Sequence, residues 1–120
     1  FSFFEFYYNP GIGLCITNNF NTFYFMLNFI DNHDGPRLLS KSDRQSMRQA
    51  LFFIMTIPGV PVIYYGTEQE LTGMRQTMFK GGVGSLNKDH FDTENTSFKF
   101  VQGLINLRKS FVKNLNIYFF

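Results

Sequence analysis

An apolar run over residues 23–30 stops abruptly at residues 31–34, which read Asp-Asn-His-Asp, and Gly-Pro follows at residues 35–36. An apolar run of this length, bounded by glycine and proline, is typical of a buried strand in a parallel sheet. Adjacent strand residues point to opposite faces, so His33 and Asp34 serve one pocket only if the strand ends there. The pattern predicts a strand that delivers polar side chains to the rim of a sheet.

A helix and a second strand follow this turn. Ser40 and Asp43 have the spacing of a capping box, with Asp in place of the usual Glu or Gln. Apolar residues then recur at three- and four-residue steps, which predicts a helix over residues 44–55. Ile-Pro-Gly at residues 57–59 ends this helix, because proline disfavours helical geometry in the residue before it. A second β-rich run covers residues 60–65, so the order of elements predicts an α/β fold with two parallel strands.

The rest of the chain is expected to form a long loop and a last helix. The glycine-rich loop covers residues 66–93, and long loops inside compact domains usually carry function. Asn95 has the position of a helix cap. Arg108 and Lys109 are expected near the C-terminus of this helix, where the dipole favours cations. The predicted buried stripe consists of Phe98, Val101, Leu104 and Ile105.

Charge and cysteine content exclude several classes of function. The net charge is +2 and the basic residues are scattered, which gives no electrostatic reason to expect nucleic acid or an anionic membrane as a partner. The apolar run over residues 23–30 is too short to cross a bilayer. A single cysteine, Cys15, excludes an intrachain disulfide.

Several segments together resemble the α-amylase family, glycoside hydrolase family 13. Residues 29–34 with Pro-Arg at 36–37 look like its Asn-His-Asp region, and residues 57–69 look like its eighth barrel strand with the following loop. Residues 75–79 and 104–109 extend the match. The segments lie in the order and roughly the spacing of the family, which makes the resemblance stronger than any one of them alone.

The resemblance implies a partial TIM (β/α)8 barrel made of the last two βα units. Residues 1–120 would form one partial catalytic domain, because a complete barrel needs ~250 residues. Residues 1–22 match the family poorly, and the aromatic stretch at residues 1–8 is expected to be either an edge strand or non-native sequence joined upstream. We therefore expect an internal fragment, with the rest of its own barrel missing.

The resemblance also implies roles for individual residues. Asp34 would be the carboxylate that stabilises the transition state, and His33 would bind a hydroxyl of the same sugar. Arg75 would lie near an outer sugar subsite. Arg37 would bind sugar, or would instead be a surface or salt-bridged arginine. The nucleophile and the acid/base of the family have no counterpart here, since no aspartate follows the Gly-x-Arg-x-Asp pattern and Glu5 lies outside the strand motif.

The alternative for these residues is a purely structural role. Without the flanking match, His33 and Asp34 would be turn-forming or hydrogen-bonded groups. Asp31 and Asn32 are expected to brace the turn in either case.

By resemblance, the parent protein is a retaining glycosidase acting on α-1,4-glucans such as starch, glycogen and maltooligosaccharides. A related α-glucosidase, a trehalose-forming transglycosylase and a non-catalytic truncated product are the alternatives. A further alternative is a metal-binding module built on His33, Asp34 and His90. The spacing of Asp89, His90 and Asp92, however, fits no strong metal motif. The family resemblance implies that Ca²⁺ would be held outside this chain, and that the protein is extracellular or lumenal.

Overall fold

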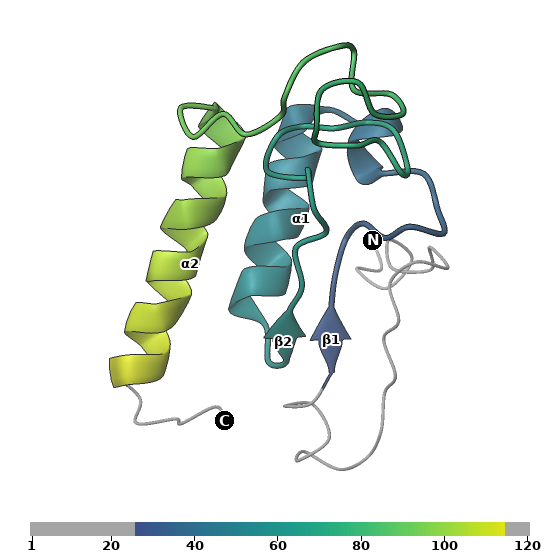
Figure 1. Ribbon diagram of the computed structural model, residues 1–120. Coiled ribbons are helices and arrows are strands. Elements are labelled where there is room, and N and C mark those ends of the chain that lie inside the picture. The colour runs from purple at the N-terminus through teal and green to yellow at the C-terminus, as the bar shows by residue number, and fades with distance from the viewer. Residues whose placement is uncertain (1–25, 115–120) are drawn as a thin grey trace.

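The computed structural model describes residues 26–114, which form two βα units (Figure 1). The elements in chain order are strand β1 (Leu27–Asn28), a 3₁₀ helix (Leu38–Ser40), helix α1 (Arg44–Thr56), strand β2 (Val60–Pro61) and helix α2 (Thr96–Asn114). This order fits a partial barrel. The expectations for residues 1–8, and for the start of the first strand at residues 23–25, lie outside the described residues.

The two strands pair in parallel, as predicted, with Leu27 opposite Val60 and Asn28 opposite Pro61. The ladder is shorter than predicted, because pairing extends neither to residue 30 nor to residue 65. Within the described residues each strand has one neighbour, and beyond Asn28 the chain bends into the turn, so the two backbones diverge. The N–H groups of Val60 and Val62 donate to the carbonyls of Met26, just before β1, and of Asn28 in β1. Pro61, which lacks this donor, therefore has its nitrogen on the side away from β1.

Helix α1 begins and ends close to its predicted bounds, but its cap is a different residue. The Asp43 carboxylate accepts a hydrogen bond from the Ser46 backbone N–H at 2.7 Å, and that bond lowers the pKa of Asp43. Ser40 lies in the 3₁₀ helix instead, where its hydroxyl donates to the Arg37 carbonyl at 2.6 Å. The capping-box prediction was wrong because the 3₁₀ helix ends at Ser40 and α1 begins only at Arg44, so Asp43 takes the N-cap position.

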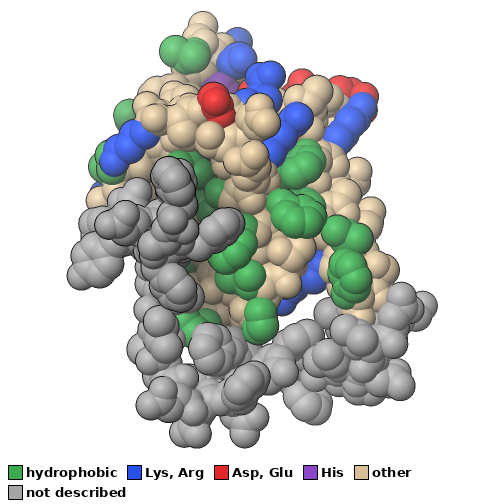
Figure 2. Space-filling view, turned by 180° about the vertical axis from the view of Figure 1, so that it is seen from behind, with side chains coloured by type: hydrophobic (Ala, Val, Ile, Leu, Met, Phe, Trp, Pro, Cys, Tyr) green, Lys and Arg blue, Asp and Glu red, His purple; other side chains and the backbone are tan. Residues whose placement is uncertain are grey.

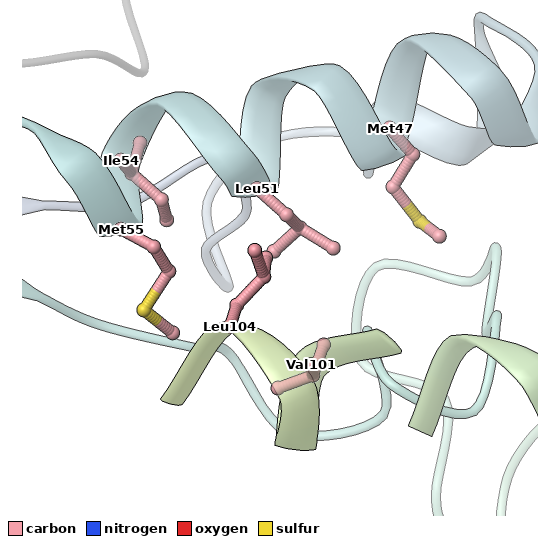
Figure 3. Close-up of a cluster of buried hydrophobic side chains, with 6 residues drawn as sticks. All are labelled: Met47, Leu51, Ile54, Met55, Val101 and Leu104. Atoms are coloured by element: carbon pink, nitrogen blue, oxygen red, sulfur yellow. The ribbon is translucent and has the colours of Figure 1, made fainter. Parts of the chain in front are cut away.

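The core of the described residues lies between the two helices (Figure 3). Its six buried side chains are Met47, Leu51, Ile54 and Met55 of α1 and Val101 and Leu104 of α2. In the predicted stripe of α2, Val101 and Leu104 are buried and Phe98 is half-buried, whereas Ile105 is 37% exposed. The prediction for Ile105 was wrong because α2 packs only a narrow face against α1. The Asn95 cap of α2 is confirmed, since its side-chain oxygen accepts from the Ser97 N–H at 2.7 Å.

Arg108 stabilises the end of the neighbouring helix instead of its own. Its guanidinium donates to the carbonyls of Met55 at 2.8 Å and Ile57 at 3.2 Å, and also to the carbonyl of Gly59. These carbonyls lie at the C-terminal end of α1, where backbone acceptors lack intrahelical partners. Because α2 continues to Asn114, Arg108 lies before its last turn, and the predicted dipole interaction does not apply.

Figure 1 shows that both strands run toward the end of the molecule where the connecting loops gather, while both helices run back from it. From behind, exposed hydrophobic side chains lie across the middle of the molecule and charged ones gather toward the loop end (Figure 2). The exposed residues include Phe52 and Phe53 of α1 and Phe111 of α2. Within residues 26–114, no helix has the length and apolar character needed to cross a membrane.

Candidate functional site

The turn after β1 is held by Asn32. Its side-chain oxygen accepts hydrogen bonds from the backbone N–H groups of Asp34 at 2.9 Å and Gly35 at 3.0 Å. A side chain that accepts from the backbone two and three residues ahead closes a tight turn without a strand partner. The predicted bracing role of Asn32 is confirmed, and the turn leaves His33 and Asp34 at its tip.

His33, Asp34 and Arg75 meet at this tip, and we call these three residues the rim cluster. The His33 Nε2 atom lies 3.2 Å from Asp34 Oδ1, and the two side chains are 63% and 70% exposed. Arg75 reaches them from the loop after β2: its Nε donates to the His33 carbonyl at 3.0 Å, and one Nη lies 3.7 Å from Asp34 Oδ1. The structure thus brings together three of the four residues that the sequence singled out.

Arg37, the fourth, lies apart from this cluster and is fully buried. Its Nε donates to the Gly73 carbonyl at 2.7 Å and its Nη2 to the Tyr65 carbonyl at 2.8 Å. The guanidinium also lies 4.4 Å from the centre of the Tyr64 ring, at cation–π distance. These contacts are all with the protein, and they favour a structural role in which backbone carbonyls take the place of a salt bridge.

Asp31 and Thr67 share this buried position with Arg37, and we call the three the bracing layer. Asp31 Oδ1 accepts from the Leu38 N–H at 2.7 Å, and Oδ2 accepts from the Thr67 hydroxyl at 2.8 Å. A longer contact of 3.4 Å joins Arg37 Nη1 to the Thr67 hydroxyl oxygen. The layer connects the turn after β1 to the loop after β2, which confirms the bracing role predicted for Asp31.

Two residues of this region were missed by sequence reasoning. Thr67 follows the second predicted strand at the same edge as Asp31, and this shared edge was the signal that could have identified it. Glu70 had no such signal. Its carboxylate accepts from Arg44 at the start of α1 and from the Ser97 hydroxyl at the start of α2, both at 2.6 Å. Burial on its own raises the pKa of Glu70, but these hydrogen bonds and the positive charge of Arg44 outweigh it and lower the pKa.

The residues considered for a metal site do not converge. His90 is buried with its Nε2 2.9 Å from the Ser85 carbonyl, and Asp89 accepts from the Lys80 backbone N–H at 2.8 Å. Within the described part of the chain, no three His, Cys, Asp or Glu side chains are grouped closely enough to hold a metal ion. His33, Asp34 and His90 therefore form no such group.

Comparison with known proteins gives consistent matches. The family model described as "Alpha amylase, catalytic domain" matches residues 14–104. A cyclomaltodextrin glucanotransferase from Thermoanaerobacterium thermosulfurigenes is 38% identical over 93 residues, which cover 78% of this chain and 12% of that protein. Two further enzymes of the same name, from Bacillus sp. (strain 38-2) and Paenibacillus macerans, are 42% identical over 83 and 86 residues. These cover 68% and 71% of this chain and 11% of each relative, so the chain spans only a small part of the curated proteins it matches.

Proposed function

The chain belongs to the α-amylase catalytic-domain family, and from this premise we propose that it forms the seventh and eighth βα units of a (β/α)8 barrel that acts on α-1,4-glucans. Active sites of such barrels lie at the C-terminal ends of the strands. In the rim cluster, His33 and Asp34 follow the C-terminal end of β1 and Arg75 follows that of β2, and this placement is the observation that carries the proposal.

Asp34 is the residue proposed to act on the reacting sugar. In retaining glycosidases one carboxylate attacks the anomeric carbon while a second carboxylic acid gives its proton to the leaving oxygen, and the sugar passes through a flattened, positively charged transition state. Both of these groups would come from the rest of the barrel. Asp34 would hydrogen-bond hydroxyls of this sugar, and its negative charge would stabilise the developing positive charge. Its exposed carboxylate, which has one oxygen close to His33, is available for such contacts.

His33 and Arg75 are proposed to bind substrate next to Asp34. The His33 ring lies at 3.2 Å from the carboxylate and would bond a hydroxyl of the same sugar. Arg75 is 67% exposed and would contact an outer sugar with the nitrogens that do not bond His33. For Arg37 the sugar-binding hypothesis remains a prediction, and its buried contacts support a bracing role.

Glucan transfer is a second outcome of the same chemistry. In hydrolysis, water attacks the anomeric carbon of the covalent glycosyl-enzyme and releases the sugar from the enzyme carboxylate. In transfer, the hydroxyl of another sugar attacks this carbon instead, releases the carboxylate and gives its proton to the conjugate base of the acid. The curated relatives are named glucanotransferases, which favours transfer as an activity of the parent protein. An α-glucosidase or a trehalose-forming enzyme would use the same residues with different substrate loops.

The proposal is tested in a complete barrel, meaning residues 26–114 within their own full-length protein or as a chimera that replaces the matching segment of the Thermoanaerobacterium enzyme. We expect such a barrel to convert starch with retention of anomeric configuration, with product analysis separating hydrolysis from transfer.

The isolated chain is the control. It should aggregate or stay molten without cleaving starch, because each described strand has only one neighbour and apolar residues such as Leu27 and Val60 are exposed on them. A folded complete barrel that leaves α-1,4-glucans unchanged would contradict the proposal.

A further inference from the structure

We infer that Arg75 is a positioning residue that holds the His33–Asp34 dipeptide in place for the reaction. This inference rests on the proposed function and goes beyond a sugar contact. Arg75 comes from the loop after β2, and its Nε hydrogen bond to the His33 carbonyl at 3.0 Å joins residues 42 positions apart in the chain. It therefore ties the tip of one loop to the backbone of the other.

Arg75 is itself held in position by the buried part of the structure. Arg37 donates to the carbonyl of Gly73 at 2.7 Å, and Gly73 and Gln76 close a turn in which the Gly73 N–H donates to the Gln76 side chain at 3.0 Å. This turn carries Arg75. A Cβ at Gly73 would lie only 2.9 Å from the Gln76 Cβ, so the turn is closely packed. The result is a connected path from buried Arg37 through the 73–76 turn to the exposed rim.

The rim has little other support. Asn32 fixes the backbone of the turn through the N–H groups of Asp34 and Gly35, whereas the carbonyl of His33 is held by Arg75. One Nη of Arg75 also lies 3.7 Å from Asp34 Oδ1. Since the Asp34 side chain is 70% exposed, neighbouring side chains restrict it only weakly by packing. We attribute the orientation of its carboxylate to the turn that Asn32 closes, to the His33 ring at 3.2 Å and to Arg75.

A positioning role and a sugar-binding role give different kinetics. A residue that binds an outer sugar contributes equally to ground state and transition state, so its loss raises KM for long substrates and leaves kcat unchanged. A residue that positions Asp34 affects the transition state for every substrate. Its loss lowers kcat for short and long glucans alike, with KM nearly constant.

The experiment uses Arg75→Gln and Arg75→Lys in the complete barrel, with maltotriose and soluble starch as substrates. For Arg75→Gln we expect kcat to fall about tenfold on both, less than the ~100-fold that a 1 Å misplacement costs, while KM for maltotriose changes less than about twofold. Lys retains the positive charge near Asp34, so Arg75→Lys should recover part of kcat. Lys80→Gln is the matched control, because it removes an exposed cation from the same loop, and its kcat should equal that of the parent barrel.

The double variant Arg75→Gln with Asp34→Asn decides whether the two residues act together. If Arg75 works through Asp34, the double variant is no slower than Asp34→Asn alone. Fully additive losses, or a KM increase confined to starch with kcat intact, would overturn the inference and leave the proposed function standing. Normal kcat in folded Asp34→Asn protein would instead overturn the proposed function.

A second variant covers the case in which Arg75→Gln fails to fold. Gly73→Ala disturbs the turn without removing the arginine, and it should show the same loss of kcat at constant KM. A normal kcat for Gly73→Ala would contradict the inference.

Discussion

Two arginines, one from each loop, connect the loop after β1 to the loop after β2, and their surroundings differ sharply. Arg37 is completely buried and bonds the carbonyls of Gly73 and Tyr65. Arg75 is 67% exposed and makes one hydrogen bond, to the His33 carbonyl, together with a longer contact to Asp34. The bracing layer around Arg37 and the rim cluster around Arg75 are thus two levels of the same pair of loops.

The difference separates stability from function. Buried polar groups are costly to leave unsatisfied, so a buried arginine with its acceptors in place contributes to the folded state. Exposed polar groups with few protein contacts contribute little to stability, but their remaining hydrogen-bonding capacity is available to a ligand. We therefore expect substitutions in the rim cluster to change kinetics and substitutions in the bracing layer to change unfolding.

The largest effect is expected at Asp34. Asp34→Asn in the complete barrel preserves shape and removes the negative charge that would face the transition state. We expect kcat to fall by roughly 10²–10³-fold, the scale of losing one preorganised electrostatic contact. Steady-state hydrolysis of starch measures this, and thermal melts should show an unchanged midpoint because the side chain is exposed. His33→Ala should cost less, since it removes a hydrogen bond and leaves the carboxylate charge in place. A near-normal kcat for Asp34→Asn would contradict the functional role that we assign to the rim cluster.

The second largest effect is expected on stability, when the same substitution is made at Arg37 in the bracing layer and at Arg75 in the rim cluster. Arg37→Met leaves the part-buried Gly73 and Tyr65 carbonyls without their donor. A fully buried unsatisfied group costs ~1–3 kcal/mol, so we expect the free energy of unfolding to fall by about 2 kcal/mol for the two together. Arg75→Met at the rim is the control and should change it by less than about 0.5 kcal/mol. Denaturant unfolding of both variants in the complete barrel measures the difference. Equal free energies of unfolding for the two variants would show that the buried arginine contributes no more to stability than the exposed one.

The smallest effect concerns Glu70, which joins the N-terminal ends of α1 and α2. Its pKa is lowered from the usual 4.5, so its charge contributes stability above that pH, and this contribution is lost as the pH falls through the lower folded-state pKa. Glu70→Gln should cost about 1 kcal/mol or less at pH 7, because the Arg44 partner is 58% exposed and screened by solvent. The difference in melting temperature between parent and variant should shrink below pH 4.5. A difference that is constant from pH 7 to pH 3 would exclude a contribution from the charge.

The local sequence was sufficient for the order of elements and for the tip of the turn. Apolar periodicity predicted α1 to within a residue or two, and the Asn95 cap followed from a short-range rule. The parallel pairing of the strands followed from the strand–helix–strand order of the elements. The polar residues after the first strand were correctly assigned to a turn, with Asn32 bracing it. The helix bounds, the cap and the turn depend on residues a few positions apart, so the local sequence determines them.

The partners of the arginines were decided by the tertiary structure. Arg37, Arg75 and Arg108 all looked alike as basic residues near turns or helix ends, yet one is buried, one reaches the rim and one stabilises the end of the neighbouring helix. Their acceptors lie 36, 42 and 53 residues away. A long, flexible cation bonds whichever carbonyls or carboxylates the fold brings within reach. Which acceptors those are depends on how the loops and helices pack, because residues so far apart in sequence have no fixed geometry until the chain has folded.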